Sequence, residues 1–226
     1  MSWIPLESDP KVMTKYLHKL GVPTQWGLVD MYGLDPDLLA MLPKPVLAII
    51  LLYPVNPKLE NYKVELESKE KESGASSDKL YHMIQYVSNA CGTVALIHSI
   101  ANNLNQIQLE DGELKKFLED TKDLSSSERG EKLTKVEGIT NAHEIFAQEG
   151  QTEAPAEDEK VLYHFIAFVE RDGSIYDLDG RKPFPINHGP SSPVTFLDDA
   201  ARVCREYMKR DPDEVHFHLM ALTANE

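Results

Sequence analysis

The chain has 226 residues, of which 42% are hydrophobic, and its 37 acidic and 23 basic side chains give a formal net charge of −14. A chain this acidic is not expected to bind nucleic acid or an anionic membrane, and its longest apolar run, Val46–Tyr53, is far too short to span a bilayer. No signal-peptide pattern opens the sequence and its two cysteines cannot build a secreted disulfide framework, so we expect a cytoplasmic protein with reduced thiols.

The first third of the chain predicts two helices and a buried strand. Ser8 is expected to cap a helix that ends before Gly21, and a second, short helix is predicted over 35–42. The continuous apolar run Pro45–Tyr53 is typical of a strand that is buried on both faces. The charged stretch Glu65–Lys79 is expected to be an exposed connection. The apolar side of the first helix would consist of Val12, Met13, Tyr16, Leu17 and Leu20.

A loop followed by a helix is predicted around Cys91. Asn89 or Ser88 is expected to cap this helix, which puts Cys91 in the first turn. Backbone N–H groups without intrahelical partners and the helix dipole favour an anion there, so the thiolate, which is the nucleophilic form, is favoured. Gly92 keeps the approach to the sulfur uncrowded, and Gln85 can offer its amide to an oxyanion that the Cys91 N–H would share. The alternative is a small buried cysteine with a structural role.

Further helices and a last strand are predicted along the chain. Residues 112–121 and 126–136 have amphipathic helical patterns, and His143–Phe146 would add a turn of helix. Thr195 is expected to open a capping box at the start of another helix, whose apolar side includes Cys204 as a core residue. The last strand is predicted over 215–222.

The segment Gln148–Glu159 has five acidic residues, no Lys or Arg, and no apolar periodicity. Such a composition is typical of a linker or of a functional loop, and taken alone it favours a linker. The chain that follows is not expected to fold by itself, so the alternative interpretation, a loop within one domain, is also kept.

A base for the thiolate must come from one of eight histidines. His98 lies about two helical turns after Cys91, roughly 10 Å away by the helical rise, which is too far for direct contact. His216 and His218 alternate on the predicted last strand, with no acidic residue placed to orient them. His18 is expected at the surface of the first helix, among lysines.

His164 differs from these because a hairpin brings an acidic partner close to it. The Asp-Gly pair at 172–173 predicts a two-residue turn between the strands Val161–Glu170 and Ile175–Asp179. In that register Asp179 lies diagonally across from His164 on the same face, about 7–8 Å away between backbones. A His–Asp pair can bridge that distance, although a lone histidine on an apolar strand is usually a core residue.

These residues form a candidate catalytic set. Cys91 would attack a carbonyl, His164 would activate the thiol and protonate the leaving group, and Asp179 would fix the imidazole. The Gln85 amide and the Cys91 N–H would hold the oxyanion. No residues have metal-ligand spacing and no glycine-rich phosphate loop is present, so neither a metal nor another cofactor is expected.

Three blocks closely resemble the signature blocks of the ubiquitin carboxyl-terminal hydrolases: QYVSNACGTVALIHSIANN, YHFIAFV and YDLDGRKPFPINHG. Shorter segments are similar to the small, free-standing cytosolic members of that family: WIPLESDP, DPDLLAMLP, AQEGQTEAP and ERGEKL. The resemblance covers essentially the whole chain. By it, Gln85 matches the oxyanion-hole residue, Cys91 the nucleophile, His164 the general base and Asp179 the third triad member.

The resemblance implies a fold that residue patterns alone do not give. It implies one catalytic domain over 1–226, with an α/β (α+β) fold in α/β/α layers and a central, antiparallel-rich sheet between helical lobes. The triad would be arranged as in papain, and the backbone would be knotted, which general rules of topology do not predict. Residues about 141–160 match an active-site crossover loop, which replaces the linker interpretation.

The activity that the resemblance implies is the release of small adducts or short peptide extensions from the C-terminal glycine of ubiquitin, through an acyl-enzyme thioester. The partner would be ubiquitin, with the related Nedd modifier left open, and the enzyme is expected to be a monomer. The N-terminal residues that match substrate contacts are Trp3, Pro5, Leu6 and Glu7. The alternative function is a ubiquitin-binding protein that holds its partner with little turnover.

Overall fold

The computed structural model describes residues 2–73, 80–151 and 161–225, in which eight helices and six strands are formed. The helices are α1 (Pro10–Lys19), α2 (Pro36–Ala40), α3 (Pro57–Ser73), α4 (Cys91–Ala101), α5 (Glu113–Thr121), α6 (Ser126–Leu133), α7 (Glu137–Ala147) and α8 (Phe196–Lys209). The strands are β1 (Trp26–Asp30), β2 (Val46–Pro54), β3 (Tyr163–Arg171), β4 (Ser174–Leu178), β5 (Ile186–Pro190) and β6 (His218–Ala224).

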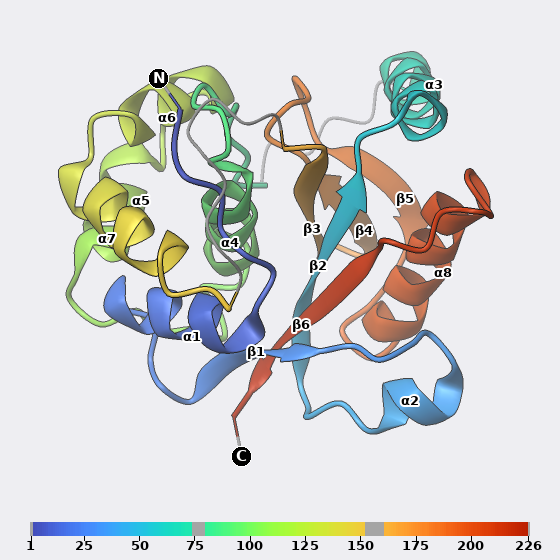
Figure 1. Cartoon of the computed structure of the whole chain (residues 1–226), viewed down its shortest axis with the longest axis horizontal. Helices are drawn as coiled ribbons and strands as arrows, with labels where there is room; N and C mark the ends of the chain where they lie inside the picture. Colours follow the sequence, from blue (N-terminus) through green and yellow to red (C-terminus); the bar gives the residue numbers. More distant parts are fainter. Residues whose placement is uncertain (1, 74–79, 152–160, 226) are drawn as a thin grey trace.

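The strands form one antiparallel sheet in the order β1-β6-β2-β3-β4-β5, with helices on both faces. Figure 1 shows α1 and α4–α7 on one side of the sheet and α2, α3 and α8 on the other. Alternate residues of β2 enter different cores: Ala48 and Ile50 face the first, whereas Ile49 and Leu51 face the second. A strand with apolar side chains on both faces must be covered on both. This confirms the predicted α/β/α layers and the buried strand.

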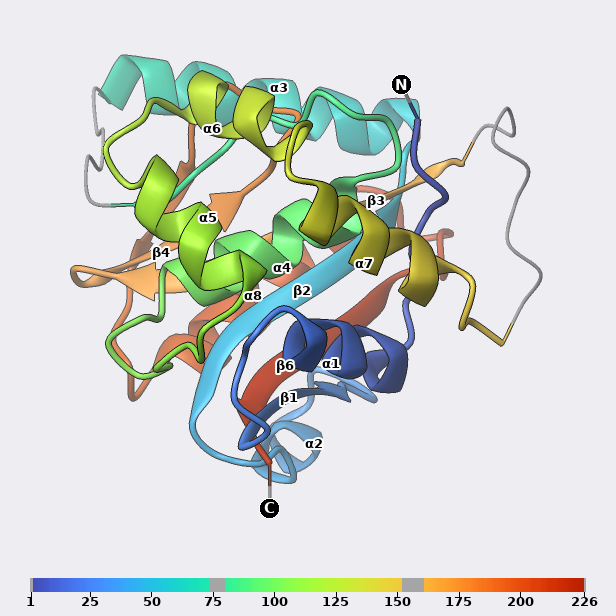
Figure 2. The ribbon, with the colours of Figure 1, turned by 90° about the vertical axis from the view of Figure 1, so that its left-hand side faces the viewer.

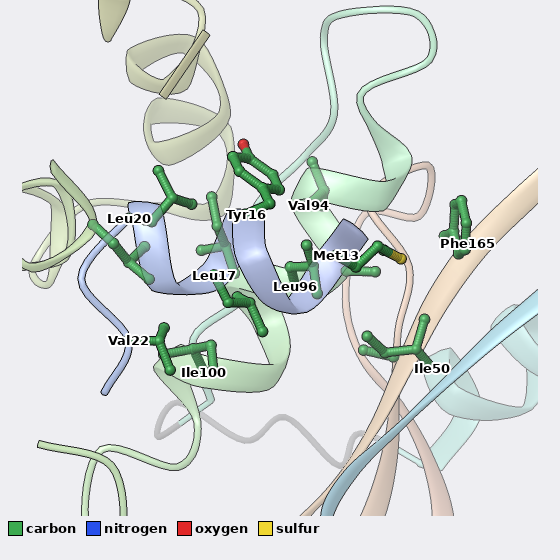
Figure 3. Packing of buried hydrophobic residues seen from close by; sticks show 14 of the residues in the cluster. Met13, Tyr16, Leu17, Leu20, Val22, Ile50, Val94, Leu96, Ile100 and Phe165 are labelled. Atoms are coloured by element: carbon green, nitrogen blue, oxygen red, sulfur yellow. The ribbon is translucent and has the colours of Figure 1, made fainter. Parts of the chain in front are cut away.

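Helix α4 forms the centre of the first core. Its residues from Gly92 to Ile100 are all buried, so the helix is enclosed on every side, as Figure 2 shows where it passes behind α5 and α7. The predicted apolar side of α1 is buried too, and Figure 3 shows Met13, Tyr16 and Leu17 packed near α4 side chains. The start of α4 is therefore held rigidly against the sheet.

The β3–β4 hairpin has the predicted register. Arg171 pairs with Ser174 and Phe168 pairs with Asp177, on either side of a two-residue turn. Asp172 and Gly173 both have positive φ, 50° and 83°, as a type I′ turn requires. The turn that the sequence shows therefore determines which side chains of the two strands share a face.

The prediction of an exposed connection over Glu65–Lys79 is wrong for its described part. Residues up to Ser73 belong to helix α3, and 74–79 lie outside the described residues. The many charged residues of this segment obscure its helical pattern in the sequence. Leu59, Tyr62 and Leu66 nevertheless recur at helical spacing and pack into the second core.

Other differences concern the ends of elements and short strands. Asp9, not Ser8, caps α1 by accepting hydrogen bonds from two backbone N–H groups, and Thr195 makes no capping bond at α8. Helix α7 is a full helix, whereas the sequence predicted only one turn there. Strands β1 and β5 were not predicted, because each is short and lacks a clear alternating pattern. The last strand begins at His218 instead of residue 215.

Candidate active site

Cys91 is the first residue of α4 and is half-buried. The predicted cap is wrong, because Ala90 occupies the N-cap position and no side chain caps the helix. Asn89 instead has a left-handed backbone with φ of 64°, and its side-chain amide donates to the carbonyl of Trp3 at 3.0 Å. The N-cap residue thus makes no side-chain bond to the first-turn N–H groups. The Gly92 N–H of that turn bonds to the Cys91 sulfur, which lies where the helix dipole favours a thiolate.

His164 and Asp179 are in direct contact, as the hairpin register predicted. His164 Nε2 donates to Asp179 Oδ1 at 2.7 Å, and the same oxygen accepts a second hydrogen bond from the Arg181 N–H at 2.8 Å. The ring of Tyr53 meets the His164 ring edge-on, with centroids 5.8 Å apart. With Nε2 held by the carboxylate and the ring fixed by packing, Nδ1 is the nitrogen that can interact with the sulfur.

Cys91 and His164 lie close enough to shift each other's pKa. Burial by itself would raise the pKa of the Cys91 thiol, but a hydrogen bond with His164, its positive charge, and the N–H groups of Phe165 and Gly92 together lower it. Burial would lower the pKa of His164, but the charge and hydrogen bond of Asp179, helped by Cys91, raise it to about 9. Both shifts favour an imidazolium–thiolate pair at neutral pH.

Gln85 lies in the loop before α4 and is tied to the loop that carries Asp179. Its backbone N–H donates to the Gly180 carbonyl at 2.7 Å, and its side-chain Nε2 donates to the Val87 carbonyl at 2.8 Å. The amide has a second N–H, which is the donor that an oxyanion would need. The oxyanion role of Gln85 stays a prediction.

Comparisons with known proteins agree with this geometry. Residues 3–209 match the sequence profile described as ubiquitin carboxyl-terminal hydrolase, family 1. A ubiquitin carboxyl-terminal hydrolase of Drosophila melanogaster is 52% identical over 225 residues, which cover 99% of this chain and 98% of that protein. A probable ubiquitin carboxyl-terminal hydrolase of Dictyostelium discoideum is 48% identical over 223 residues, covering 98% and 88%. This chain belongs to ubiquitin carboxyl-terminal hydrolase family 1.

The fold of this hydrolase is also similar to a solved structure. The catalytic domain of Trichinella spiralis UCH37, determined bound to ubiquitin vinyl methyl ester, superimposes with a TM-score of 0.77 at 26% identity. The match covers 100% of this chain and 97% of that one. The family and the papain-like fold that the sequence blocks implied are therefore confirmed.

A pocket of about 420 Å³ opens beside Cys91 in this hydrolase. Three of the predicted substrate contacts, Pro5, Leu6 and Glu7, line it. A Cβ on Gly92 would lie 3.1 Å from Leu6 Cδ1, so the glycine lets Leu6 lie directly against the start of α4. The N-terminal segment therefore forms a wall of the pocket that contains the sulfur.

The fourth predicted contact, Trp3, is buried beneath that wall and is not among the residues that line the pocket. The centroid of its ring lies 4.4 Å from that of the His143 ring, and its backbone N–H donates to the Ser88 carbonyl at 2.9 Å. The bonds with Ser88 and Asn89 attach the N-terminal segment to the loop before Cys91, and the ring contact attaches it to α7.

The predicted crossover loop, about 141–160, is described only in part. Residues 141–147 are the end of α7, which corrects the predicted start of the loop, and 152–160 lie outside the described residues. Glu149 pairs with Lys15 at 3.2 Å and Gln151 donates to Asp9 at 3.1 Å. The described beginning of the loop is thus attached to α1.

The prediction that no acidic residue orients His216 or His218 is wrong. His216 Nδ1 lies 2.6 Å from Glu214, and His218 Nε2 lies 2.9 Å from Asp30. Asp30 was missed because it is on β1, a strand that the sequence did not predict. The Nδ1 of His218 is hydrogen-bonded to Ser8, so this arrangement ties the segment before α1 to the sheet.

His98 and Cys204 are both buried, whereas His18, expected at the surface of the first helix, is half-buried and its Nε2 is hydrogen-bonded to the Trp26 carbonyl at 2.8 Å. His98 is buried in α4, and burial lowers its pKa to about 3, so the neutral ring accepts a hydrogen bond from the Met83 N–H. Cys204 is buried in the second core. Among the described residues, no group of three or more His, Cys, Asp or Glu side chains could hold a metal ion. No helix within the same part of the chain is both long and apolar enough to cross a membrane.

Sequence reasoning missed Lys63, which is fully buried next to Asp179. Its Nζ lies 3.3 Å from Asp179 Oδ2. It was missed because α3 was not predicted. The helical spacing of Leu59, Tyr62 and Leu66 was the available signal, since it places Lys63 on the apolar side of that helix.

Proposed function

We propose that this chain hydrolyses the bond between the C-terminal glycine of ubiquitin and a small adduct or short peptide extension. The observation that supports it most directly is a cysteine at the start of a helix, with a lowered pKa, beside a histidine bound to an aspartate at 2.7 Å. The net charge of −14 is compatible with a partner that has a basic tail. The chain acts as one catalytic domain and as a monomer.

The reaction has two halves. The Cys91 thiolate attacks the carbonyl carbon of the glycine, and the oxyanion is held by the Cys91 N–H and the Gln85 amide. His164 protonates the leaving amine as the C–N bond breaks, which leaves a thioester. His164 then removes a proton from water, which attacks the thioester and releases the carboxylate and the thiolate. Asp179 keeps the imidazole oriented throughout.

Substrate recognition would use the pocket wall formed by Leu6 and Glu7. A tail that ends in two glycines has no side chains there and can reach the sulfur through this pocket, whereas a folded leaving group cannot enter it. A competition experiment tests whether the Nedd modifier is also accepted. If Nedd with a C-terminal electrophile labels Cys91 as fast as the corresponding ubiquitin reagent, Nedd is also a substrate.

The test is the intact mass of the protein after mixing with ubiquitin that bears a C-terminal electrophile. We expect one adduct on the wild type, none on Cys91→Ala, and none with ubiquitin lacking its tail. Turnover of a C-terminal amide of ubiquitin then separates a hydrolase from a ubiquitin-binding protein. Binding without an adduct would overturn the proposal and leave the binding function in its place.

A further inference from the structure

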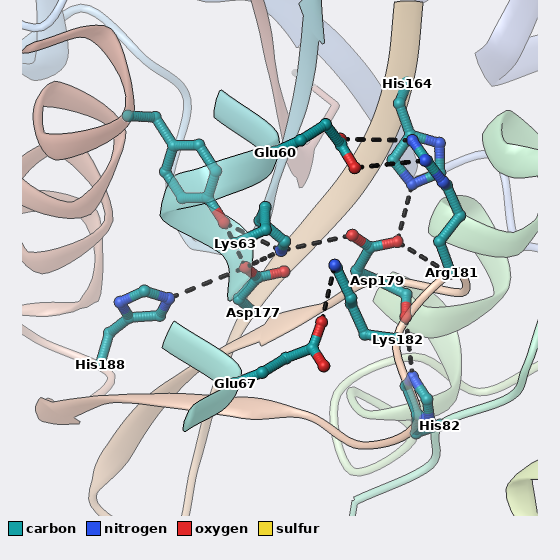
Figure 4. Close-up of polar contacts among 11 residues, drawn as sticks. Glu60, Lys63, Glu67, His82, His164, Asp177, Asp179, Arg181, Lys182 and His188 are labelled. Carbon is teal, nitrogen blue, oxygen red and sulfur yellow. Dashed lines mark hydrogen bonds and ion pairs between the residues drawn. The ribbon is translucent and has the colours of Figure 1, made fainter. Parts of the chain in front are cut away.

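Lys63 is the fully buried amine of α3, and it lies between two carboxylates. Its Nζ is 2.6 Å from Asp177 Oδ2 and 3.3 Å from Asp179 Oδ2, and it donates to the Tyr207 hydroxyl at 3.0 Å. Figure 4 shows Lys63 pointing from α3 toward both carboxylates, on the side of Asp179 away from His164. Burying an ammonium group costs free energy unless the group is paired, so a functional reason for this buried lysine is sought in its two carboxylate partners.

The second carboxylate, Asp177, has no part in the proposed reaction. It is on β4, two residues before Asp179, so that both side chains point to the same face, and both are buried. Two buried carboxylates this close cannot both stay ionised without a cation, and one of them would take up a proton. The Asp179 carboxylate must stay ionised to hold the His164 imidazolium.

We propose that Lys63 is a positioning residue of the hydrolase: its charge neutralises Asp177, so that Asp179 stays ionised with one oxygen toward His164 and the other toward Lys63. The inference rests on the proposed function for its role in catalysis. Lys63 does not line the pocket beside Cys91, so it acts through Asp179 and not on the substrate.

The electrostatics of the cluster agree with this role. Burial would lower the pKa of Lys63, but Asp177 and Asp179 outweigh it and raise the pKa, so the ammonium stays charged. Burial would raise the pKa of Asp179, but His164 and then Lys63 lower it well below its usual range. Two cations from opposite sides therefore stabilise one carboxylate.

Among the described residues, Lys63 is the only lysine that forms an ion pair with either carboxylate. Tyr207 on α8 donates to Asp177, and His188 on β5 lies 3.8 Å from it. Near Asp179, the Arg181 side chain pairs with Glu60 at 3.3 Å, and the ring of His82 donates to the Asp179 carbonyl at 3.0 Å. Tyr53, which is edge-on to His164, faces both carboxylates, and Tyr62 and Cys204 face Asp177. The Lys182 ammonium pairs with Glu67 at 2.7 Å.

The experiment measures the rate of Cys91 alkylation by iodoacetamide against pH, which needs no ubiquitin and so tests the ion pair independently of the proposed function. Four proteins are compared: wild type, Lys63→Met, Lys63→Arg, and Lys63→Met with Asp177→Asn. The double variant removes one cation and one anion, so the charge balance around Asp179 is kept. Circular dichroism and urea unfolding show whether each variant is folded.

For Lys63→Met we expect the acid limb of the alkylation profile to move up by about 1–3 pH units, because Asp179 now competes for a proton with Asp177. Lys63→Arg and the double variant should keep the wild-type limb. With a ubiquitin C-terminal amide, kcat of Lys63→Met at pH 7 should fall about tenfold or more, while the Kd for ubiquitin stays within about twofold.

A merely structural role gives a different result. A folded Lys63→Met variant with the wild-type acid limb would overturn the proposal, as would a double variant whose limb moves as far as that of the single variant. If Lys63→Met does not fold, the double variant decides alone, because the proposal requires it to fold and to keep the wild-type profile. A wild-type profile without a thiolate at neutral pH would instead contradict the proposed chemistry of Cys91.

Discussion

Replacing Asp179 by asparagine removes one charge and keeps the shape of the side chain. In the wild type the pKa of His164 rises from 6.5 to about 9, chiefly because Asp179 outweighs the effect of burial. Without that charge, burial should bring the pKa below its ordinary value. A loss of at least that shift corresponds to about 3 kcal/mol of imidazolium stabilisation. We therefore expect kcat/KM to fall on the order of 10²-fold or more at pH 7.

The assay follows hydrolysis of a ubiquitin C-terminal amide and, in parallel, iodoacetamide alkylation against pH. The onset of Cys91 alkylation should move to higher pH in Asp179→Asn, because the thiolate has lost its cationic partner. The matched control is Asp172→Asn in the turn of the same hairpin, where asparagine suits the positive φ of 50°. The reasoning is refuted if folded Asp179→Asn keeps the wild-type alkylation onset and a kcat/KM close to that of the control.

Three further outcomes follow from the same contacts. Because the pKa of His164 is raised to about 9, its contribution to stability is full below about pH 6.5 and is lost as the pH rises through about 9. Urea unfolding of the wild type should therefore show the free energy of unfolding falling by at most about 3 kcal/mol over this range, and Asp179→Asn should not show this fall. Asn89→Ala should lower the free energy of unfolding by about 1–2 kcal/mol, because φ is 64° there and alanine is strained at that angle. Asn89→Gly also loses the hydrogen bond to Trp3 but has no such strain, so its loss should be smaller. An equal loss in both variants would contradict the strain argument. Gly130→Ala should lower the melting temperature markedly, because its Cβ would lie 1.8 Å from the Ile84 carbonyl oxygen, and an unchanged melting temperature would show that the loop gives way.

The parts of the site that sequence could predict are those set by short-range rules. The two-residue turn at Asp172 fixed the hairpin register, and that register placed His164 near Asp179, which are 2.7 Å apart. The position of Cys91 in the first turn of a helix followed from the apolar spacing after it. Each depends on residues that are neighbours along the chain or across one turn.

The parts that sequence missed depend on contacts between distant segments. Asn89 does not cap α4, because its amide bonds to Trp3, 86 residues earlier. His218 acquires an acidic partner only because β6 pairs with β1, which brings Asp30 beside it from 188 residues away. A capping preference of about 1 kcal/mol is easily outweighed by such tertiary bonds. The knotted backbone is implied only by the family resemblance, because no local pattern encodes it, and it stays a prediction.

The proposed triad lies where the two helical layers meet at the sheet, and each layer contributes one charged group to the cluster that the triad forms with Lys63. Cys91 comes from α4, whose side chains pack in the first core, and Lys63 comes from α3, whose side chains pack in the second. His164 and Asp179 stand between them, on the hairpin that both layers cover. Because the charge on each group depends on its neighbour, a shift of either layer by even about 1 Å would weaken the whole series of contacts. The tight packing of both cores therefore holds in place the contacts that lower the pKa of Cys91, in addition to stabilising the fold.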